Sequence, residues 1–381
     1  MRLARWEWRK LFRLPALWGF LGLCLAFNCL LMADPALYER DFFNQTSDVT
    51  GTLGQRVDED FIAGLSELPP SELRDFLFQT ATDMEDIFET YETKNLMDFY
   101  TDIVSASPLA IKWMTWKYDL LSHRVEHLAE TDAAMDLYAG PTTHDSHQFL
   151  FGTLFHAILG EAAILAMLGT LYLLGYEGLH QTEALACASR VGRKLWHHKV
   201  LAAVLASIAL YVLVAAPTLG IYFTLFDYGG IWGASVSSQF NYFTDMLFTR
   251  PFLTWSDFTV AGYLAAALAL GGALTVTFSM LAALCGSLVR NTYLAALVLG
   301  VICFGGLFLT SALGELELWA AYLIACFQPV LVWLCCNGWF TEMGLSAVLP
   351  WQETIAVGID LLILGVGTVL ALHRFNRKDV A

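Results

Sequence analysis

His123, Glu126 and His127 follow the spacing H-x-x-E-H, a pattern that can hold zinc. On a helix the two histidines would share one face, and His144 and His147 follow downstream. Patterns of five residues arise often by chance, however, and an exposed helical face explains the same residues without chemistry. No C-x-x-C spacing accompanies the pattern. We therefore predict neither a metal site nor a cofactor.

Glu161 lies in the middle of an apolar run, with His156 on the same predicted helix. An ionisable residue at that depth in a membrane normally faces a cavity or a partner helix, and so marks a polar pathway. Residues five apart on a helix point about 140° from one another, so the two are not a simple pair. A protonated Glu161 hydrogen-bonded at a helix contact explains the residue equally well. Both interpretations stay open.

The stretch YEGLHQTEALACASRVGRKLWHHK (176–199) places two glutamates and four Lys or Arg residues between two apolar runs. Thr182 is positioned to cap a short helix that has Glu183 in its first turn. Arg190 and Arg193 would lie towards the end of that helix, which suits the helix dipole. The plainer interpretation is a solvated loop that binds nothing. The alternative is a surface that a partner grips.

Six apolar runs surround these residues, and each is near the roughly 20 residues that a helix needs to cross a bilayer. The chain is 57% hydrophobic and only 15% charged, which fits several membrane spans better than one soluble core. We therefore predict an all-α polytopic membrane protein with six transmembrane helices. Its segments are an interfacial helix (1–14), span 1 (15–33), an extracellular, mostly helical domain (34–149), spans 2–5 (150–312, with the loop 177–199), an outer re-entrant hairpin (313–354), and span 6 with a tail (355–381).

The positions of the basic residues predict the orientation of the spans. Thirteen of the 21 Lys and Arg residues fall on one side of a six-span arrangement, including all those before span 1 and after span 6. Basic residues favour the cytoplasmic side, so we predict that both termini are cytoplasmic. The segment 34–149 holds 23 acidic and 7 basic residues and would then be external. Helical spacing from Leu73 to Tyr91, after Pro69-Pro70-Ser71, and a second stretch from Pro108 towards Tyr138 predict its helices.

The segment 313–354 is apolar enough to suggest a seventh span, but it is interrupted at Gln328-Pro329 and again at Asn337-Gly338. A seventh span would also carry the basic tail outside, against the charge rule. We expect two short helices that enter the outer leaflet and return, packed against protein. At the other end of the chain, Arg2, Arg5, Arg9 and Arg13 fall on one side of the predicted helix 1–14, and Leu3, Trp8, Leu11 and Leu14 lie on other sides. Such an amphipathic helix lies in the membrane interface.

The loop and the topology together resemble the permease subunits of exporter-type ABC transporters, the type-2 ABC permease family. An acid ends one span, a Thr-Glu pair and a basic turn with a glycine follow, and a lysine opens the next span. In this sequence the residues are Glu177, Thr182, Glu183, Leu185, Ser189, Arg190, Gly192, Arg193 and Lys199. The interfacial first helix, the six spans and the broken outer hairpin extend the resemblance over nearly the whole chain.

The resemblance implies that the loop is a coupling helix seated on a separate ATPase subunit. It also implies a second permease subunit, in a homodimer, and a multi-pass place in a bacterial plasma membrane. The chain contains no Gly-Lys pair and hence no phosphate-binding loop of the G-x-x-x-x-G-K-[ST] type. We therefore expect no enzymatic activity in this chain, and ATP hydrolysis in the partner. The ATPase-coupling residues would be Glu177, Thr182, Glu183, Arg190, Gly192 and Arg193.

A function of another class also fits the composition. The acidic external domain would attract a cationic ligand, so a membrane sensor or scaffold without transport is the alternative to an exporter. The sequence does not identify a transported substrate. Beyond the ATPase and the second permease, membrane lipid is the only partner that it indicates.

Overall fold

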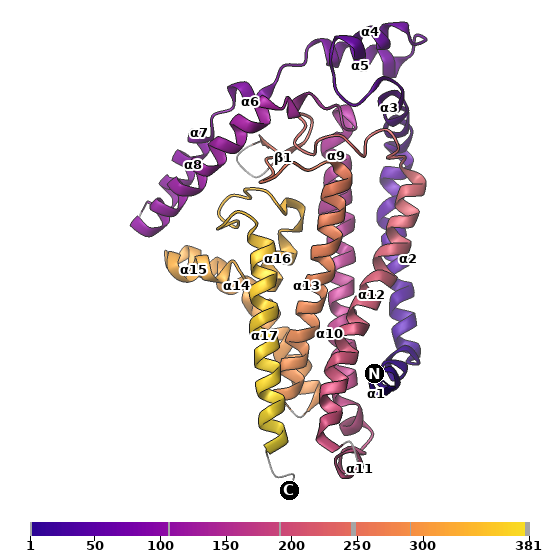
Figure 1. Ribbon diagram of the computed structural model, residues 1–381, viewed down its shortest axis with the longest axis vertical. Coiled ribbons are helices and arrows are strands. Elements are labelled where there is room, and N and C mark those ends of the chain that lie inside the picture. The colour runs from indigo at the N-terminus through magenta and orange to yellow at the C-terminus, as the bar shows by residue number, and fades with distance from the viewer. Residues whose placement is uncertain (1, 106, 190–191, 245–248, 290, 378–381) are drawn as a thin grey trace.

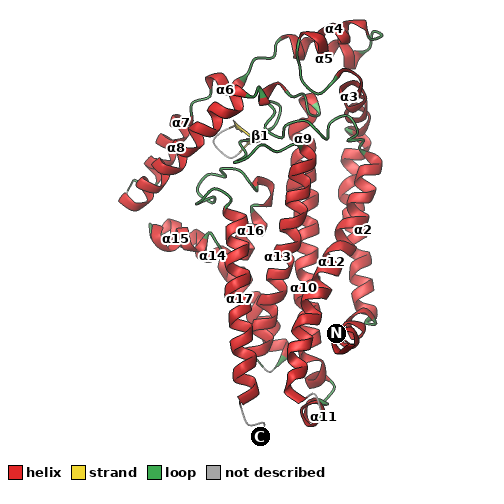
Figure 2. Ribbon diagram, in the orientation of Figure 1, coloured by secondary structure: helices red, strands yellow, loops and turns green. Residues whose placement is uncertain are grey.

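The computed structural model describes residues 2–377, apart from 106, 190–191, 245–248 and 290. Within these residues six helices are long and apolar enough to cross a membrane, so the chain is a multi-pass, largely helical membrane protein (Figures 1 and 2). They are α2 (Pro15–Tyr38), α10 (Phe155–Leu179), α12 (Leu195–Leu225), α13 (Val260–Leu288), α14 (Thr292–Glu315) and α17 (Gln352–Arg377). The six apolar runs of the sequence are therefore confirmed as helices, with ends that differ by a few residues.

Span 2 is longer than its apolar run. The short helix α9 (Thr143–His147) and the π-helix η3 (Gln148–Leu154) lead into α10 without a break. Together with the 3₁₀ turn η2 (Gly140–Thr142) they form 40 residues of helical backbone. A seven-residue π-helix is unusual, because the wider turn weakens backbone hydrogen bonding. The polar residues of α9, together with Gln148, explain why the sequence pattern began the span only at 150.

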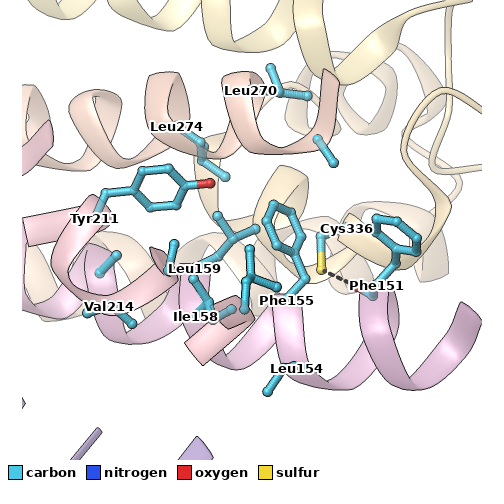
Figure 3. Packing of buried hydrophobic residues seen from close by; sticks show 14 of the residues in the cluster. Phe151, Leu154, Phe155, Ile158, Leu159, Tyr211, Val214, Leu270, Leu274 and Cys336 are labelled. Atoms are coloured by element: carbon cyan, nitrogen blue, oxygen red, sulfur yellow. Dashed lines mark hydrogen bonds between the residues drawn. The ribbon is translucent and has the colours of Figure 1, made fainter. Parts of the chain in front are cut away.

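The core of the bundle is built around α10 and α13. In the most apolar window of each of these helices 61% of the residues are buried, against 22% in α14, which lies at the edge. Figure 3 shows side chains of α10 and η3 interdigitating with those of α12 and α13. The labelled residues are Phe151, Leu154, Phe155, Ile158, Leu159, Tyr211, Val214, Leu270 and Leu274. Cys336 also contacts this layer, with its thiol 3.6 Å from the Phe151 carbonyl oxygen.

Both ends of the described chain lie at one end of the bundle, together with the short helix α11 (Glu183–Ala188) (Figure 1). The N-terminal helix α1 (Arg2–Phe12) precedes α2 there, as the amphipathic pattern predicted. Figure 1 places the helices α3 to α9 at the opposite end. They include α3 (Arg40–Leu53), α4 (Glu59–Glu67), α5 (Glu72–Thr82), α6 (Ile87–Thr90), α7 (Thr93–Ile103), α8 (Pro108–Glu130) and the 3₁₀ turn η1 (Ala133–Met135).

Local signals explain where several of these helices begin. Ser71 caps α5 through a hydrogen bond from the Arg74 backbone N–H, as the Pro-Pro-Ser sequence predicted. The predicted helical spacing as far as Tyr91 is wrong as a single helix. Asp83 ends α5, and α6 is a separate single turn capped by Asp86.

The all-α prediction misses one small sheet. The connection between α12 and α13 contains β1 (Tyr242–Thr244) and β2 (Thr249–Pro251), which pair antiparallel with Phe243 opposite Arg250. Three-residue strands are too short to display a period of two in the sequence, so the pattern could not reveal them. The same connection packs tightly on α3. A Cβ atom at Gly230 would lie 1.9 Å from the Ser47 carbonyl oxygen.

The segment before α17 forms two short helices, α15 (Trp319–Ala325) and α16 (Pro329–Leu334), followed by the 3₁₀ turn η5 (Cys336–Gly338). The chain breaks at Gln328-Pro329, where the sequence predicted an interruption. The Gln328 amide donates to the Gly306 carbonyl oxygen of α14 at 2.7 Å, so the break is fixed to the neighbouring helix. Trp319 and Cys326 share a hydrophobic cluster with residues of α7 and α8.

Candidate functional site

Four charged side chains meet where α1 lies against the end of α10 and the start of α12. The Lys199 ammonium contacts Glu177 and lies 3.3 Å from Glu7 Oε2. The Lys10 ammonium lies 2.7 Å from Glu7 Oε1 and 3.0 Å from Glu177 Oε1. Each lysine thus bridges both glutamates. We call Glu7, Lys10, Glu177 and Lys199 the α1 charge network.

The α1 charge network is balanced, and three of its four side chains are buried. Lys199 is fully buried, and Glu7 and Glu177 are 4% and 5% exposed. Burial alone would lower the pKa of Lys10, but its hydrogen bonds to Glu7 and Glu177 raise that pKa above the ordinary value. The Tyr176 ring adds to the enclosure, with the Lys10 ammonium 4.4 Å from its centroid. Two positive and two negative charges leave no net charge to be stabilised by water.

Between α10 and α12 the chain projects as the exposed helix α11. None of its residues is buried, and Leu185 is 74% exposed. Gln181 begins the projection with a φ of 55°, in the left-handed region, and lets the chain turn sharply out of α10. Gly192 ends it with the same φ of 55° and donates its N–H to the Ser189 hydroxyl at 3.2 Å. The result is a short apolar tip held between two turns.

The predicted coupling residues divide into two groups. Thr182 directly precedes α11 and Glu183 opens its first turn, as predicted, but the Thr182 side chain makes no capping hydrogen bond. Glu183 is half-buried and lines a pocket with Trp196 and Thr292. Arg190 and the side chain of Arg193 lie outside the described residues.

The side chain of Glu177 is not accessible to a partner protein. The sequence interpretation offered its carboxylate to donors on another protein, whereas both of its oxygens face Lys10 and Lys199. That expectation of direct contact is corrected, because the carboxylate is buried and already balanced. Sequence reasoning missed Glu7 and Lys10 altogether. The available signal was a single acid within a strongly basic amphipathic helix.

Within the spans, Glu161 joins a second polar contact rather than His156. The Asn28 amide donates to Glu161 Oε2 at 2.9 Å and to the Thr218 hydroxyl at 3.1 Å. This contact links α2, α10 and α12, and Asn28 is completely buried. His156 points elsewhere, with its ring 4.3 Å from the ring of Trp333. The two residues are therefore separate features, as their angular spacing predicted.

At the opposite end of the bundle, Glu342 lies in a buried cluster with Lys117 and Arg250. The Lys117 ammonium is 3.4 Å from Glu342 Oε2, and the Arg250 guanidinium donates to Glu342 Oε1. Tyr118 donates to the same carboxylate at 3.1 Å. The cluster joins α8, β2 and the segment after η5. It therefore ties three regions that are distant in sequence into one end of the molecule.

The cluster carries one more positive than negative charge, and this affects its titration. Burial lowers the pKa of Lys117 to about 8, although Glu342 acts to raise it. Burial alone would raise the pKa of Glu342, but the charges of Lys117 and Arg250 hold it below its usual range. Lys117 is thus the group in this cluster whose charge changes nearest to neutral pH.

The histidines of the H-x-x-E-H pattern have other partners. His127 lies 3.0 Å from Asp257, and His123 lies 3.3 Å from Glu126. Burial would raise the pKa of Asp257, but hydrogen bonds from His127 and Arg124 lower it. Among the described residues no group of three His, Cys, Asp or Glu side chains is arranged to hold a metal ion.

Comparisons with protein-family models, with curated proteins and with solved structures find no match. The six apolar helices alone define the class, which is a multi-pass helical membrane protein. Its most distinctive features are the α1 charge network and the exposed helix α11 beside it.

Proposed function

We propose that this chain is the membrane-spanning permease subunit of an ATP-driven ABC exporter, and that α11 is its contact with a separate ATPase subunit. The observation that carries the proposal is the exposed apolar tip at Leu185, whose flanking helices are fixed by the buried α1 charge network. A force applied to a flexible loop would deform the loop without moving the helices that it connects. Applied to α11, it is transmitted to α10 and α12 together, because Lys199 and Glu177 join their ends.

The residues near α11 then have distinct roles. Leu185 and Glu183 contact the ATPase, with Thr182 at the start of the helix, and Arg190, Gly192 and Arg193, which follow α11 in the sequence, add to the contact. Glu177 is a positioning residue, which acts through Lys199 and Lys10 on the direction in which α11 leaves the bundle. This division follows from exposure, since a buried and balanced carboxylate offers nothing to a partner.

A contact between α11 and a cytoplasmic ATPase also sets the orientation of the chain in the membrane. The end of the bundle with α1, α11 and the C-terminal end of α17 faces the cytoplasm, and the helices α3 to α9 form an extracellular domain. The segment 313–354 is an outer re-entrant hairpin, with α15 and α16 packed on that domain. A second copy of the chain completes the permease, and Glu161 lines or gates the polar part of the route. This places the acidic segment 34–149 outside and the basic clusters inside, in agreement with the charge rule.

The decisive experiment is purification of the tagged full chain from its native membrane in mild detergent. We expect a P-loop ATPase subunit to co-purify in stoichiometric amount and to hydrolyse ATP in the complex. Preparations that carry no such subunit, in several detergents, would refute the exporter and favour the sensor or scaffold whose acidic domain binds a cationic ligand.

A pair of matched variants assigns the contact to α11. Leu185→Asp places a charge on the tip, and Leu109→Asp places the same charge on the exposed side of α8 at the opposite end. Both leucines are more than half exposed, so neither change should disturb the fold. We expect loss of the ATPase only with Leu185→Asp. Equal binding by both variants would mean that the partner docks away from α11.

A further inference from the structure

A groove of about 680 Å³ runs between α1 and α12, on the side of α1 away from the charge network. Its α12 wall consists of Leu201, Ala202 and Leu205, and its α1 wall includes Phe12 and Trp8. Leu201 and Leu205 are 47% and 46% exposed although they belong to a membrane-spanning helix. The groove therefore opens towards the hydrocarbon of the bilayer.

The rim of this groove carries two guanidinium groups. Arg5 and Arg9 both line it, and residues four apart on a helix lie on the same side. Both side chains are exposed, and the Arg9 guanidinium lies 5.4 Å from the ring centroid of Trp6. Arginine pairs recognise phosphate oxygens through several directed hydrogen bonds. The exposed Trp6 and Trp8 mark the depth at which lipid headgroups begin.

We propose that the groove binds one anionic phospholipid. Arg5 and Arg9 donate hydrogen bonds to its phosphate, and one acyl chain lies along Phe12, Leu201 and Leu205. The charge complementarity selects a lipid with net negative charge, since two cations at the rim face no acid of the groove wall. The apolar floor selects a lipid over a soluble phosphate.

The position of the groove gives the lipid an effect beyond anchoring. Helix α1 uses one side for the lipid and the other for Glu7 and Lys10 of the α1 charge network. A bound lipid therefore stabilises α1 in the place where the network closes. This role does not depend on the ATPase, because the network joins α1 to α10 and α12 within the chain itself.

The test measures lipid retained by the full chain in nanodiscs of phosphatidylcholine containing phosphatidylglycerol. After transfer to mild detergent, native mass spectrometry counts the bound lipids. We expect one retained phosphatidylglycerol per chain and preference over phosphatidylcholine. Each arginine near an anionic lipid contributes about a fivefold preference, so Arg5→Gln with Arg9→Gln should lower retention by about 25-fold. Soluble glycerol phosphate should not compete.

Two matched controls separate a site from diffuse attraction. Arg13→Gln removes an exposed charge of the same segment that does not line the groove. Leu205→Trp fills the groove with all charges kept, and Val212→Trp makes the same change on α12 outside it. We expect loss of lipid with Leu205→Trp and not with Arg13→Gln or Val212→Trp. Equal loss with Arg13→Gln, full retention with Leu205→Trp, or competition by glycerol phosphate would each overturn the proposal. Unchanged thermal unfolding in phosphatidylcholine alone confirms that the variants are folded.

Discussion

Replacing Lys199 by methionine tests whether the α1 charge network holds this end of the bundle together. Methionine keeps the length of the apolar stem and removes the ammonium group, which also donates to the Leu173 carbonyl oxygen. Glu7 Oε2 and Glu177 Oε2 accept no hydrogen bond of good geometry in the described chain, so the Lys199 ammonium is their counter-charge. Without it, two buried carboxylates share the partly exposed Lys10.

The magnitude follows from the burial of the network. Removing one partner of a buried ion pair costs about 3–5 kcal/mol, because the remaining charge stays desolvated. For a chain of this length each kcal/mol lowers the unfolding temperature by about 2 °C, so a fall of about 6–10 °C is expected. The assay is thermal unfolding of the full chain in detergent, followed by tryptophan fluorescence and circular dichroism. Lys194→Met, an exposed lysine five residues earlier, is the control and should change little.

A second change makes the reasoning refutable. Lys199→Met combined with Glu177→Gln leaves Glu7 and Lys10, so the buried charge is balanced again. The double variant should therefore be at least about 2 kcal/mol more stable than the sum of the two single losses. A Lys199→Met protein that melts within 1 °C of wild type, or strictly additive losses, would show that the four charges do not act as one network.

Three further outcomes are expected. Burial lowers the pKa of Lys117 to about 8 from 10.5, so the unfolded chain binds that proton more tightly and stability should rise as pH increases from about 8 to 10.5. This rise in the free energy of unfolding is worth about 3 kcal/mol. Lys117→Met should abolish most of it, whereas the exposed Lys112→Met should retain it. Unfolding of both variants measured across that pH range tests the expectation. Gly230→Ala should destabilise the chain by about 2–4 kcal/mol, because its Cβ would overlap the backbone of α3. Gly229→Ala should be tolerated, because its Cβ would meet only a side-chain oxygen. Equal unfolding temperatures for the two variants would contradict this expectation. Glu161→Gln keeps an acceptor for its amide partner, so assembly should be intact while transport or stimulated ATP hydrolysis changes; normal activity would make the residue a structural contact only.

The spans could be predicted from the sequence because the bilayer imposes a length and a composition on each of them. For example, the fourth of the six apolar runs covers about residues 259–289 of the sequence, and the helix α13 (Val260–Leu288) differs from it by one residue at each end. The break at Gln328-Pro329 was also predictable, since proline disfavours the continuation of a preceding helix, although α2 and α12 do continue through Pro35 and Pro217. Both are local properties, carried by residues close together in the chain.

Only part of the candidate site could be predicted, because the rest depends on contacts between residues that are far apart in the sequence. Thr182, Glu183 and the exposed tip are local, and the sequence located them. Glu177 was identified as important but assigned to the wrong surroundings, because its partner Lys10 is 167 residues away. A single sequence does not report such pairing. The same limit hid the contact of Glu161 with Asn28, which are 133 residues apart.

The α1 charge network and the cluster of Lys117, Arg250 and Glu342 lie at opposite ends of the bundle and differ in net charge. The α1 charge network attaches α1 to the spans α10 and α12, whereas the cluster of Lys117, Arg250 and Glu342 joins three segments outside the spans. Apolar packing alone would leave α1 able to slide along α12, since methyl groups specify position weakly, whereas Lys199 and Glu177 each fix one point on α1. The α1 charge network pairs two positive with two negative side chains, so it adds no net charge where it holds α1. The cluster of Lys117, Arg250 and Glu342 has a net positive charge and a lysine that titrates near pH 8, so its stability depends on the solution around it. The end of the bundle that carries α11 is thus held by a balanced set of buried charges, and the opposite end by an unbalanced one.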